Sequence, residues 1–186
     1  MRAPTHPHAD WRILCAALAL FLALSGCVGH ASRTVSGLPA TSRAPAAAAA
    51  DQPCVQTSHG CISLNPDVTT ETLAGTICSS GYTRSVRPSS SYTQAIKKRL
   101  LREAGLSEST QGEYELDHII PLALGGHPRK LSNLALQPWD GEHGATRKDR
   151  LELRLQHLVC HGELELHAAQ VCIAEDWEAC AARYSR

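Results

Sequence analysis

The sequence has no excess of charge of either sign: its 186 residues include 18 Lys and Arg and 18 Asp and Glu. Proteins that hold long nucleic acid tightly usually carry a basic excess, so the composition argues against strong duplex binding and leaves transient contact with a substrate open. The chain also lacks an internal repeat, which excludes repeat architectures. It has no apolar run of the ~20 residues that a membrane-spanning helix needs.

The longest apolar run, 13–24, follows a start made positive by Arg2 and Arg12, as in an export signal. Leu-Ser-Gly-Cys at 24–27 resembles a bacterial lipobox, so we predict a lipoprotein signal peptide over 1–26, with lipid attached to the Cys27 thiol. Ordinary signal cleavage nearby, with Cys27 unmodified, is the alternative. One lipidated terminus anchors a protein without spanning the membrane. We therefore expect an exported protein without a transmembrane helix in its mature form, anchored in the bacterial cell envelope, at the outer membrane, the cell surface or in the periplasm.

The part after the signal divides into a tether and one domain. Residues 27–53 are mostly small, with a run of alanines at 46–50, and this composition predicts a flexible linker. Residues 54–186 fit one domain of ordinary size. Without the charged residues of the signal, 16 basic and 17 acidic residues remain, a net charge near −1.

The predicted domain contains six cysteines: Cys54, Cys61, Cys78, Cys160, Cys172 and Cys180. An even number in an exported domain indicates disulfides. We favour Cys78 with Cys160, which joins the segment before the core to the end of a long helix. If Cys172 and Cys180 lie on one helix, their Cα atoms are roughly 12 Å apart. A disulfide needs about 7 Å or less, so these two should not pair.

Cys54 and Cys61 then either pair with each other or reach Cys172 and Cys180. A zinc site made of Cys54, His59 and Cys61 is the less favoured alternative, because there is no CxxC knuckle and zinc thiolates are uncommon in an oxidising space.

Spacing of apolar residues and turn signals predict a helix, two strands and two further helices. Ser91 is the expected N-cap of the first helix, and the glycine pair at 125–126 closes the first strand. The predicted helices are 92–104, 145–160 and 166–183, and the strands are 113–124 and 134–136.

Chemically useful residues gather between 114 and 152. Asp117 and His118 stand together before the glycine pair, and Asn133 and His143 follow. Neutral imidazole suits a general base because its pKa lies near working pH. Carboxylate and imidazole together suit a divalent metal, and an amide can orient an imidazole. This set can build a single-metal phosphodiesterase site.

These parts, in this order, resemble the HNH endonuclease motif of the ββα-metal superfamily. The resemblance rests on Asp117-His118, the glycine pair, Ser132-Asn133-Leu134 and the Lys-Asp start of the third helix. Residues 65–177 are also similar to a group of exported bacterial proteins with an HNH-like signature. The resemblance implies an α+β fold with a ββα-metal core of a hairpin and a helix. N- and C-terminal helices would flank this core, and disulfides would staple it.

The resemblance also implies a metal-dependent HNH-type nuclease that cleaves DNA or RNA. His118 would be the general base and Asn133 would orient it. Asp117 and His143 would hold one divalent metal ion, which could be Mg, Mn, Zn or Ni. Arg147 and Lys148 are the candidates for contact with substrate phosphate, although pairing with Asp149 and Glu152 on the helix surface is an equal alternative.

Two features of the sequence weigh against a complete site. The register from Lys148 can place Gly144, which offers no ligand, where the motif has its second ligand. Neighbours on a regular strand face opposite sides, so Asp117 and His118 share a site only if the strand twists or ends there. A purely structural interpretation has Asp117 in a salt bridge, His118 half-buried and Asn133 closing a turn. The protein would then be a catalytically degenerate envelope module that binds or supports other components.

Overall fold

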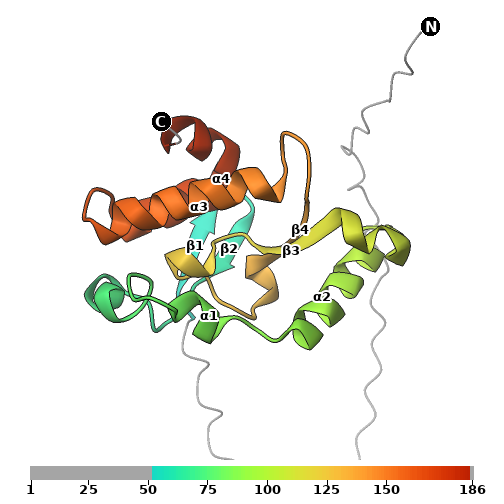
Figure 1. The fold of residues 1–186 in the computed structure, drawn as a ribbon, viewed down its shortest axis with the longest axis horizontal. Coiled ribbons are helices and arrows are strands. Elements are labelled where there is room, and N and C mark those ends of the chain that lie inside the picture. The colour runs from blue at the N-terminus through green and yellow to red at the C-terminus, as the bar shows by residue number, and fades with distance from the viewer. Residues whose placement is uncertain (1–51, 185–186) are drawn as a thin grey trace, which may run out of the picture. The chain divides into compact units, whose positions relative to one another are not determined.

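The computed structural model describes residues 52–184, and they form a mixed α+β fold with two small antiparallel hairpins (Figure 1). The predicted signal peptide, the lipidation site Cys27 and nearly all of the tether lie outside the described residues. The strands are β1 (Cys54–Thr57), β2 (Gly60–Ser63), β3 (Tyr114–His118) and β4 (Leu134–Pro138). The α-helices are α1 (Tyr82–Val86), α2 (Ser90–Glu103), α3 (Ala145–Cys160) and α4 (Leu166–Tyr184). Short 3-10 helices cover Thr70–Gly75, Glu108–Glu113, Leu122–Leu124 and Leu131–Asn133.

The hairpin β1–β2 was not predicted. Its four-residue strands are too short to show a clear alternation, but Val55 opposite Ile62 buries one face of it. The turn residue Gly60 has a φ of 112°, which side-chain-bearing residues rarely adopt. A disulfide joins Cys54 to Cys61 across the two strands, so the local pairing left open by the sequence is the one observed.

The hairpin β3–β4 was predicted, but its first strand is shorter than expected. Pairing runs from Tyr114 opposite Pro138 to His118 opposite Leu134, and there the ladder stops. The predicted strand continued to 124. Pro121 has no N–H to donate to a ladder and instead caps the 3-10 turn Leu122–Leu124. Gly126 then packs so closely that an added Cβ would lie 1.7 Å from the carbonyl oxygen of Ile120.

Helix α3 has the predicted bounds. Its buried face carries Leu151, Leu155 and Val159, which pack with Ile173 of α4 in the core. Helix α2 begins at Ser90 because the Ser89 hydroxyl accepts a hydrogen bond from the amide of Tyr92, a cap two residues earlier than expected. In Figure 1, α3 and α4 lie together on one side of the hairpins and α2 lies beside β3–β4.

The expectation that Cys172 and Cys180 cannot pair is wrong, because α4 is not one straight helix. Asp176 has non-helical backbone angles (φ −159°, ψ 93°). Its Oδ1 accepts hydrogen bonds from the amides of Glu178 and Ala179, both at 3.0 Å, and so caps a second helical segment. The chain changes direction there, and the Cα atoms of the two cysteines lie 5.4 Å apart in a disulfide.

The predicted bond between Cys78 and Cys160 is present. It spans 82 residues of sequence, and closing a loop of that length in the unfolded chain is worth about 4.5 kcal/mol. Three disulfides indicate an oxidising environment. Within 52–184, no helix combines the length and the apolar character needed to cross a membrane.

Candidate functional site

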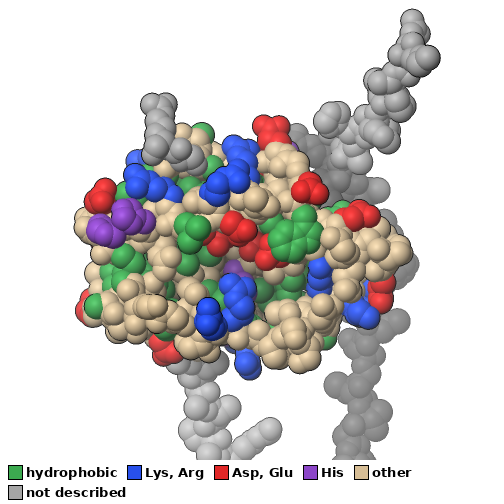
Figure 2. Space-filling view, viewed as in Figure 1, with side chains coloured by type: hydrophobic (Ala, Val, Ile, Leu, Met, Phe, Trp, Pro, Cys, Tyr) green, Lys and Arg blue, Asp and Glu red, His purple; other side chains and the backbone are tan. Residues whose placement is uncertain are grey.

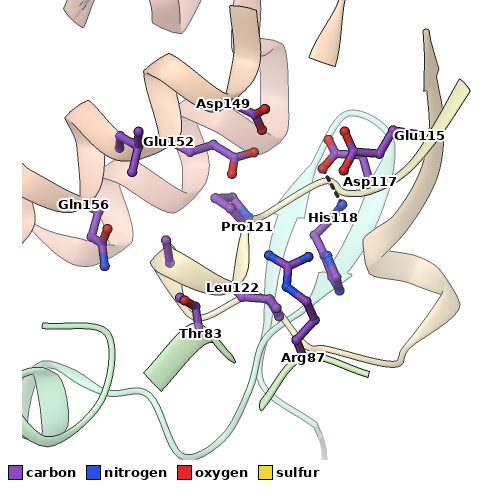
Figure 3. Close-up of a pocket in the computed structure, with 12 residues that line it drawn as sticks. Thr83, Arg87, Glu115, Asp117, His118, Pro121, Leu122, Asp149, Glu152 and Gln156 are labelled. Carbon is purple, nitrogen blue, oxygen red and sulfur yellow. Dashed lines mark hydrogen bonds between the residues drawn. The ribbon is translucent and has the colours of Figure 1, made fainter. Parts of the chain in front are cut away.

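A cavity of about 350 Å³ lies between β3, the middle of α3 and the segment before α2 (Figure 3). Its chemistry comes from six of its lining residues, which are Arg87, Glu115, Asp117, His118, Asp149 and Glu152. Figure 3 shows the carboxylates of β3 and α3 directed toward one another, with Arg87 reaching in from the opposite side. Figure 2 shows this face with acidic side chains above a hollow and basic side chains below it.

Asp117 and His118 border this cavity together, although they are neighbours in sequence. On a continuing strand they would face opposite sides of the hairpin. His118 is the last residue of β3, and the chain leaves the strand there, so its side chain is free to turn toward the cavity. The sequence analysis required the strand to twist or end here if Asp117 and His118 were to share a site. The strand does end at His118.

The imidazole of His118 is held in one orientation. Its Nε2 lies 3.1 Å from the carbonyl oxygen of Pro128, and a carbonyl can only accept, so Nε2 carries the proton in the neutral ring. Nδ1 therefore carries the lone pair. Within 52–184, Nδ1 has no hydrogen-bond partner. Every buried side-chain nitrogen or oxygen in this part of the chain does have a partner, so Nδ1 is not buried and reaches solvent. The side chain is 7% exposed, and this burial lowers the pKa of His118 below 6.5.

The carboxylate of Asp117 is engaged on both oxygens. Oδ1 accepts a hydrogen bond of 2.7 Å from the backbone amide of His118, and Oδ2 lies 2.8 Å from Nζ of Lys148. A carboxylate oxygen has two lone pairs, so each oxygen keeps capacity for a further partner.

Lys148 does not present its charge to solvent as a phosphate contact would. Its side chain is buried, with 3% of the residue exposed, and Nζ donates to the carbonyl of His118 at 2.9 Å. The same Nζ binds Asp117 and, at 2.5 Å, Glu152. Burial alone would lower the pKa of Lys148, but the two carboxylates more than offset this and raise it. Of the two roles that the sequence allowed, the structure shows the pairing with Glu152, and Lys148 acts as an internal cation.

The carboxyl groups of the cavity outnumber its cations. Burial first, and then the charges of Asp117 and Asp149, raise the pKa of Glu115 to about 7. Burial and the charge of Asp117 also raise the pKa of Asp149. Burial raises the pKa of Glu152 to about 7 in spite of Lys148. The cavity is therefore short of positive charge near neutral pH.

Asn133 does not contact the ring of His118 as the HNH resemblance implied. It is fully buried and closes the loop between β3 and β4. Its Oδ1 accepts from the amide of Ile120 at 2.8 Å, and its Nδ2 donates to the carbonyls of Ile120 and His127. Because Pro128 follows His127 directly, Asn133 fixes the loop that supplies the carbonyl holding His118. Its influence on the imidazole is indirect.

His143 and Arg147 lie away from the cavity of His118. Nδ1 of His143 is bonded to a carboxylate oxygen of Glu178, which the bend of α4 brings into reach. Arg147 donates to the carbonyl of Glu142 and lies over the ring of Trp177. His143 borders a second cavity of about 490 Å³ together with Asp117. Among residues 52–184 no group of three or more His, Cys, Asp or Glu side chains is placed to hold a metal ion.

The sequence analysis did not single out Arg87 or Glu115 as site residues. Arg87 comes from the loop before α2, far from the motif, and no local pattern marks it. Glu115 could be found by counting two residues back from Asp117 on the strand. None of the ion pairs within 52–184 involves Arg87, so its guanidinium remains available to an anion in the cavity.

We predict that Glu115→Gln stabilises the protein at pH 8 and not at pH 4. The folded pKa of Glu115 is about 7 and its ordinary value is 4.5, so the folded state holds a proton that the unfolded state releases between these values. Stability from this group is complete below pH 4.5 and is lost as the pH rises through 7. The variant should melt roughly 2–4 °C higher at pH 8, as measured by circular dichroism. Glu113→Gln, on an exposed residue nearby, is the control, and equal melting shifts for both variants would refute the assignment.

No protein-family model, curated protein or solved structure matches this chain. Its function must therefore be argued from the motif and from the cavity.

Proposed function

We propose that this chain is a metal-dependent nuclease with an HNH-like ββα core, which hydrolyses phosphodiester bonds of nucleic acid. One observation carries the proposal: His118, whose Nδ1 carries the lone pair, borders a cavity with four carboxyl groups and with Arg87, which has no ion pair within 52–184. The chain order β3, β4, α3, with the site where the hairpin meets the helix, supports the ββα assignment.

The residues present can perform the proton transfer that hydrolysis needs. Nδ1 of His118 accepts a proton from the attacking water, and the bond from Nε2 to the carbonyl of Pro128 keeps the ring in place as it becomes charged. Burial lowers the pKa of His118, which favours the neutral ring with its lone pair on Nδ1. Arg87 offsets the charge of the phosphate and of the departing oxygen.

The donor set fits a hard divalent cation better than it fits zinc or nickel. Glu115, Asp117 and Asp149 supply oxygen only, which suits magnesium or manganese. Within 52–184 these carboxylates are not already gathered into a three-ligand group, so binding an ion would have to draw them together. The raised pKa of Glu115 reflects carboxyl groups with too little positive charge around them, and a cation would relieve this. When bound, such an ion would place positive charge on the scissile phosphate. His143 does not belong to this set, because it is bonded to Glu178.

The expected place of action is the bacterial cell envelope. The disulfides suit an exported protein, and we propose that lipid on Cys27 anchors the folded domain through the predicted tether. Labelling cells with a radioactive fatty acid should mark the wild-type chain and not Cys27→Ser. Equal labelling of both proteins would show that Cys27 is not the site of lipid attachment.

A second function is favoured by a specific observation. Asp117 is paired with Lys148, His118 is hydrogen-bonded and Asn133 closes a loop, as the structural interpretation of the sequence requires. A protein with these residues in structural roles would be a degenerate HNH-fold module that binds or supports other envelope components.

Cleavage assays separate the two functions. Supercoiled plasmid and single-stranded oligonucleotides are incubated with the full-length chain in magnesium, manganese, zinc or chelator. We expect cleavage with magnesium or manganese and none with chelator, because the proposed reaction needs a cation that the carboxylates would hold. Absence of cleavage under every condition would favour the degenerate module.

A further inference from the structure

Another hollow, distinct from the cavity that His143 borders, adjoins the cavity of His118 on the side of α2. It has a volume of about 350 Å³ and shares three lining residues, Arg87, Glu115 and His118, with the first cavity. A chain that places its scissile phosphate at His118 therefore continues directly into this hollow. Figure 2 shows hydrophobic and basic side chains next to the acidic group on this face.

Trp139 forms one wall of the hollow and is an unusual residue to leave in solvent. It follows β4 directly, and its backbone amide donates to the carbonyl of Glu113, which fixes the start of the side chain. Its side chain does not pack into the core, and the residue is 40% exposed. Trp177, by contrast, packs against the core. An indole that follows a hydrogen-bonded strand end and is open to solvent is a surface on which a planar base can stack.

The hollow also carries positive charge. Lys97 of α2 and Arg87 both line it, and neither takes part in an ion pair within 52–184. Glu115 is its one acidic residue, and it lies on the wall shared with the first cavity. A phosphate would therefore lie toward Arg87 and Lys97, and a base would lie against Trp139.

We infer that this hollow binds an unpaired nucleotide next to the scissile phosphate, so that the preferred substrate is single-stranded nucleic acid. The inference rests on the proposed nuclease function. A base in a duplex is stacked on its neighbours and cannot lay its face on an indole without being unpaired. The net charge of the chain is consistent with this preference for single strands, because a chain with equal numbers of acidic and basic residues has little general attraction for a duplex.

Binding can be measured apart from cleavage. Fluorescence anisotropy of a labelled oligothymidine, alone or paired with oligoadenosine, is followed with the full-length chain in chelator. We expect the single strand to bind about 10-fold more tightly than the duplex, which is the effect of one base–aromatic stack. Trp139→Ala should remove that preference and Trp139→Phe should keep most of it. Lys97→Ala should reduce the slope of log K against log salt by about 0.7.

The matched control is Leu131→Ala, an equally exposed residue that lines neither hollow. It should bind both strands as the wild type does, and melting curves verify that every variant is folded. Equal affinity of the wild type and Trp139→Ala for the single strand overturns the inference, whether or not the chain cleaves. So does failure of the wild type to bind. Binding that depends on Trp139, without cleavage in magnesium or manganese, supports the subsite and overturns the nuclease proposal.

Discussion

Replacing His118 with Ala lowers the rate of phosphodiester cleavage by about 10²- to 10⁴-fold, the usual contribution of a general base. The loss is expected in kcat and not in KM, because the imidazole acts on water and not on the bound substrate. The imidazole is buried and hydrogen-bonded to the carbonyl of Pro128, so its removal also costs some stability, and melting curves verify that the variant is folded at the assay temperature.

The pH profile adds a test that a purely structural role would not pass. Burial lowers the pKa of His118, which favours the neutral form of the base near neutral pH. His118 should therefore cause no fall in rate from pH 7 to pH 8, and protonation should slow the reaction only in acid. His157→Ala, an exposed histidine of α3 outside the cavity, serves as the control and should cleave at the wild-type rate. Undiminished cleavage by His118→Ala would remove the assignment.

Replacing Lys148 with Met destabilises the fold by about 3–5 kcal/mol at pH 8, the usual cost of leaving buried charges without their partner. Its ammonium is the only cation bonded to the buried carboxyls of Asp117 and Glu152 within the described residues, and it also caps the carbonyl of His118. Urea denaturation followed by circular dichroism measures the loss. The double variant with Glu152→Gln should recover part of it, because one of the two unpaired charges is then gone.

The pH dependence distinguishes charge from packing. Burial raises the pKa of Glu152 to about 7, so at pH 4 its carboxyl is protonated and no longer needs the ammonium, and the variant should lose less stability at pH 4 than at pH 8. Lys98→Met removes an exposed lysine that pairs with Glu108 at 3.4 Å, and it should change stability little at either pH. An equal loss at both pH values for Lys148→Met would contradict the charge argument.

Part of the fold follows from local sequence. Helix α3 has the predicted bounds because Leu151, Leu155 and Leu158 recur at helical spacing and the glycine of residue 162 prevents its continuation. The hairpin β1–β2 was missed because its strands hold too few residues for a period of two to be visible. The disulfide of Cys172 was missed because a single aspartate, at 176, can cap a new helical segment inside an apparently continuous one.

The sequence predicted the central pair of site residues, Asp117 and His118, but not the contacts of the residues around them. Asp117 and His118 were identified from the motif, and they do border one cavity. The burial of Lys148 could have been expected, because it lies three residues before Leu151 and so on the apolar face of α3. Arg87 could not be found in this way, since only the path of the chain before α2 brings it to the cavity. The pairing of His143 with Glu178 likewise depends on the bend in α4.

The most direct test of the site uses a small phosphodiester without a base, bis(p-nitrophenyl) phosphate, so that recognition of nucleic acid does not enter. Its hydrolysis is measured in manganese with the wild type and with His118→Ala, after melting curves show that both are folded. A neutral imidazole acting beside cation-binding carboxylates predicts hydrolysis by the wild type and only background release by the variant. Equal rates for the two proteins, or no hydrolysis by either, would contradict it.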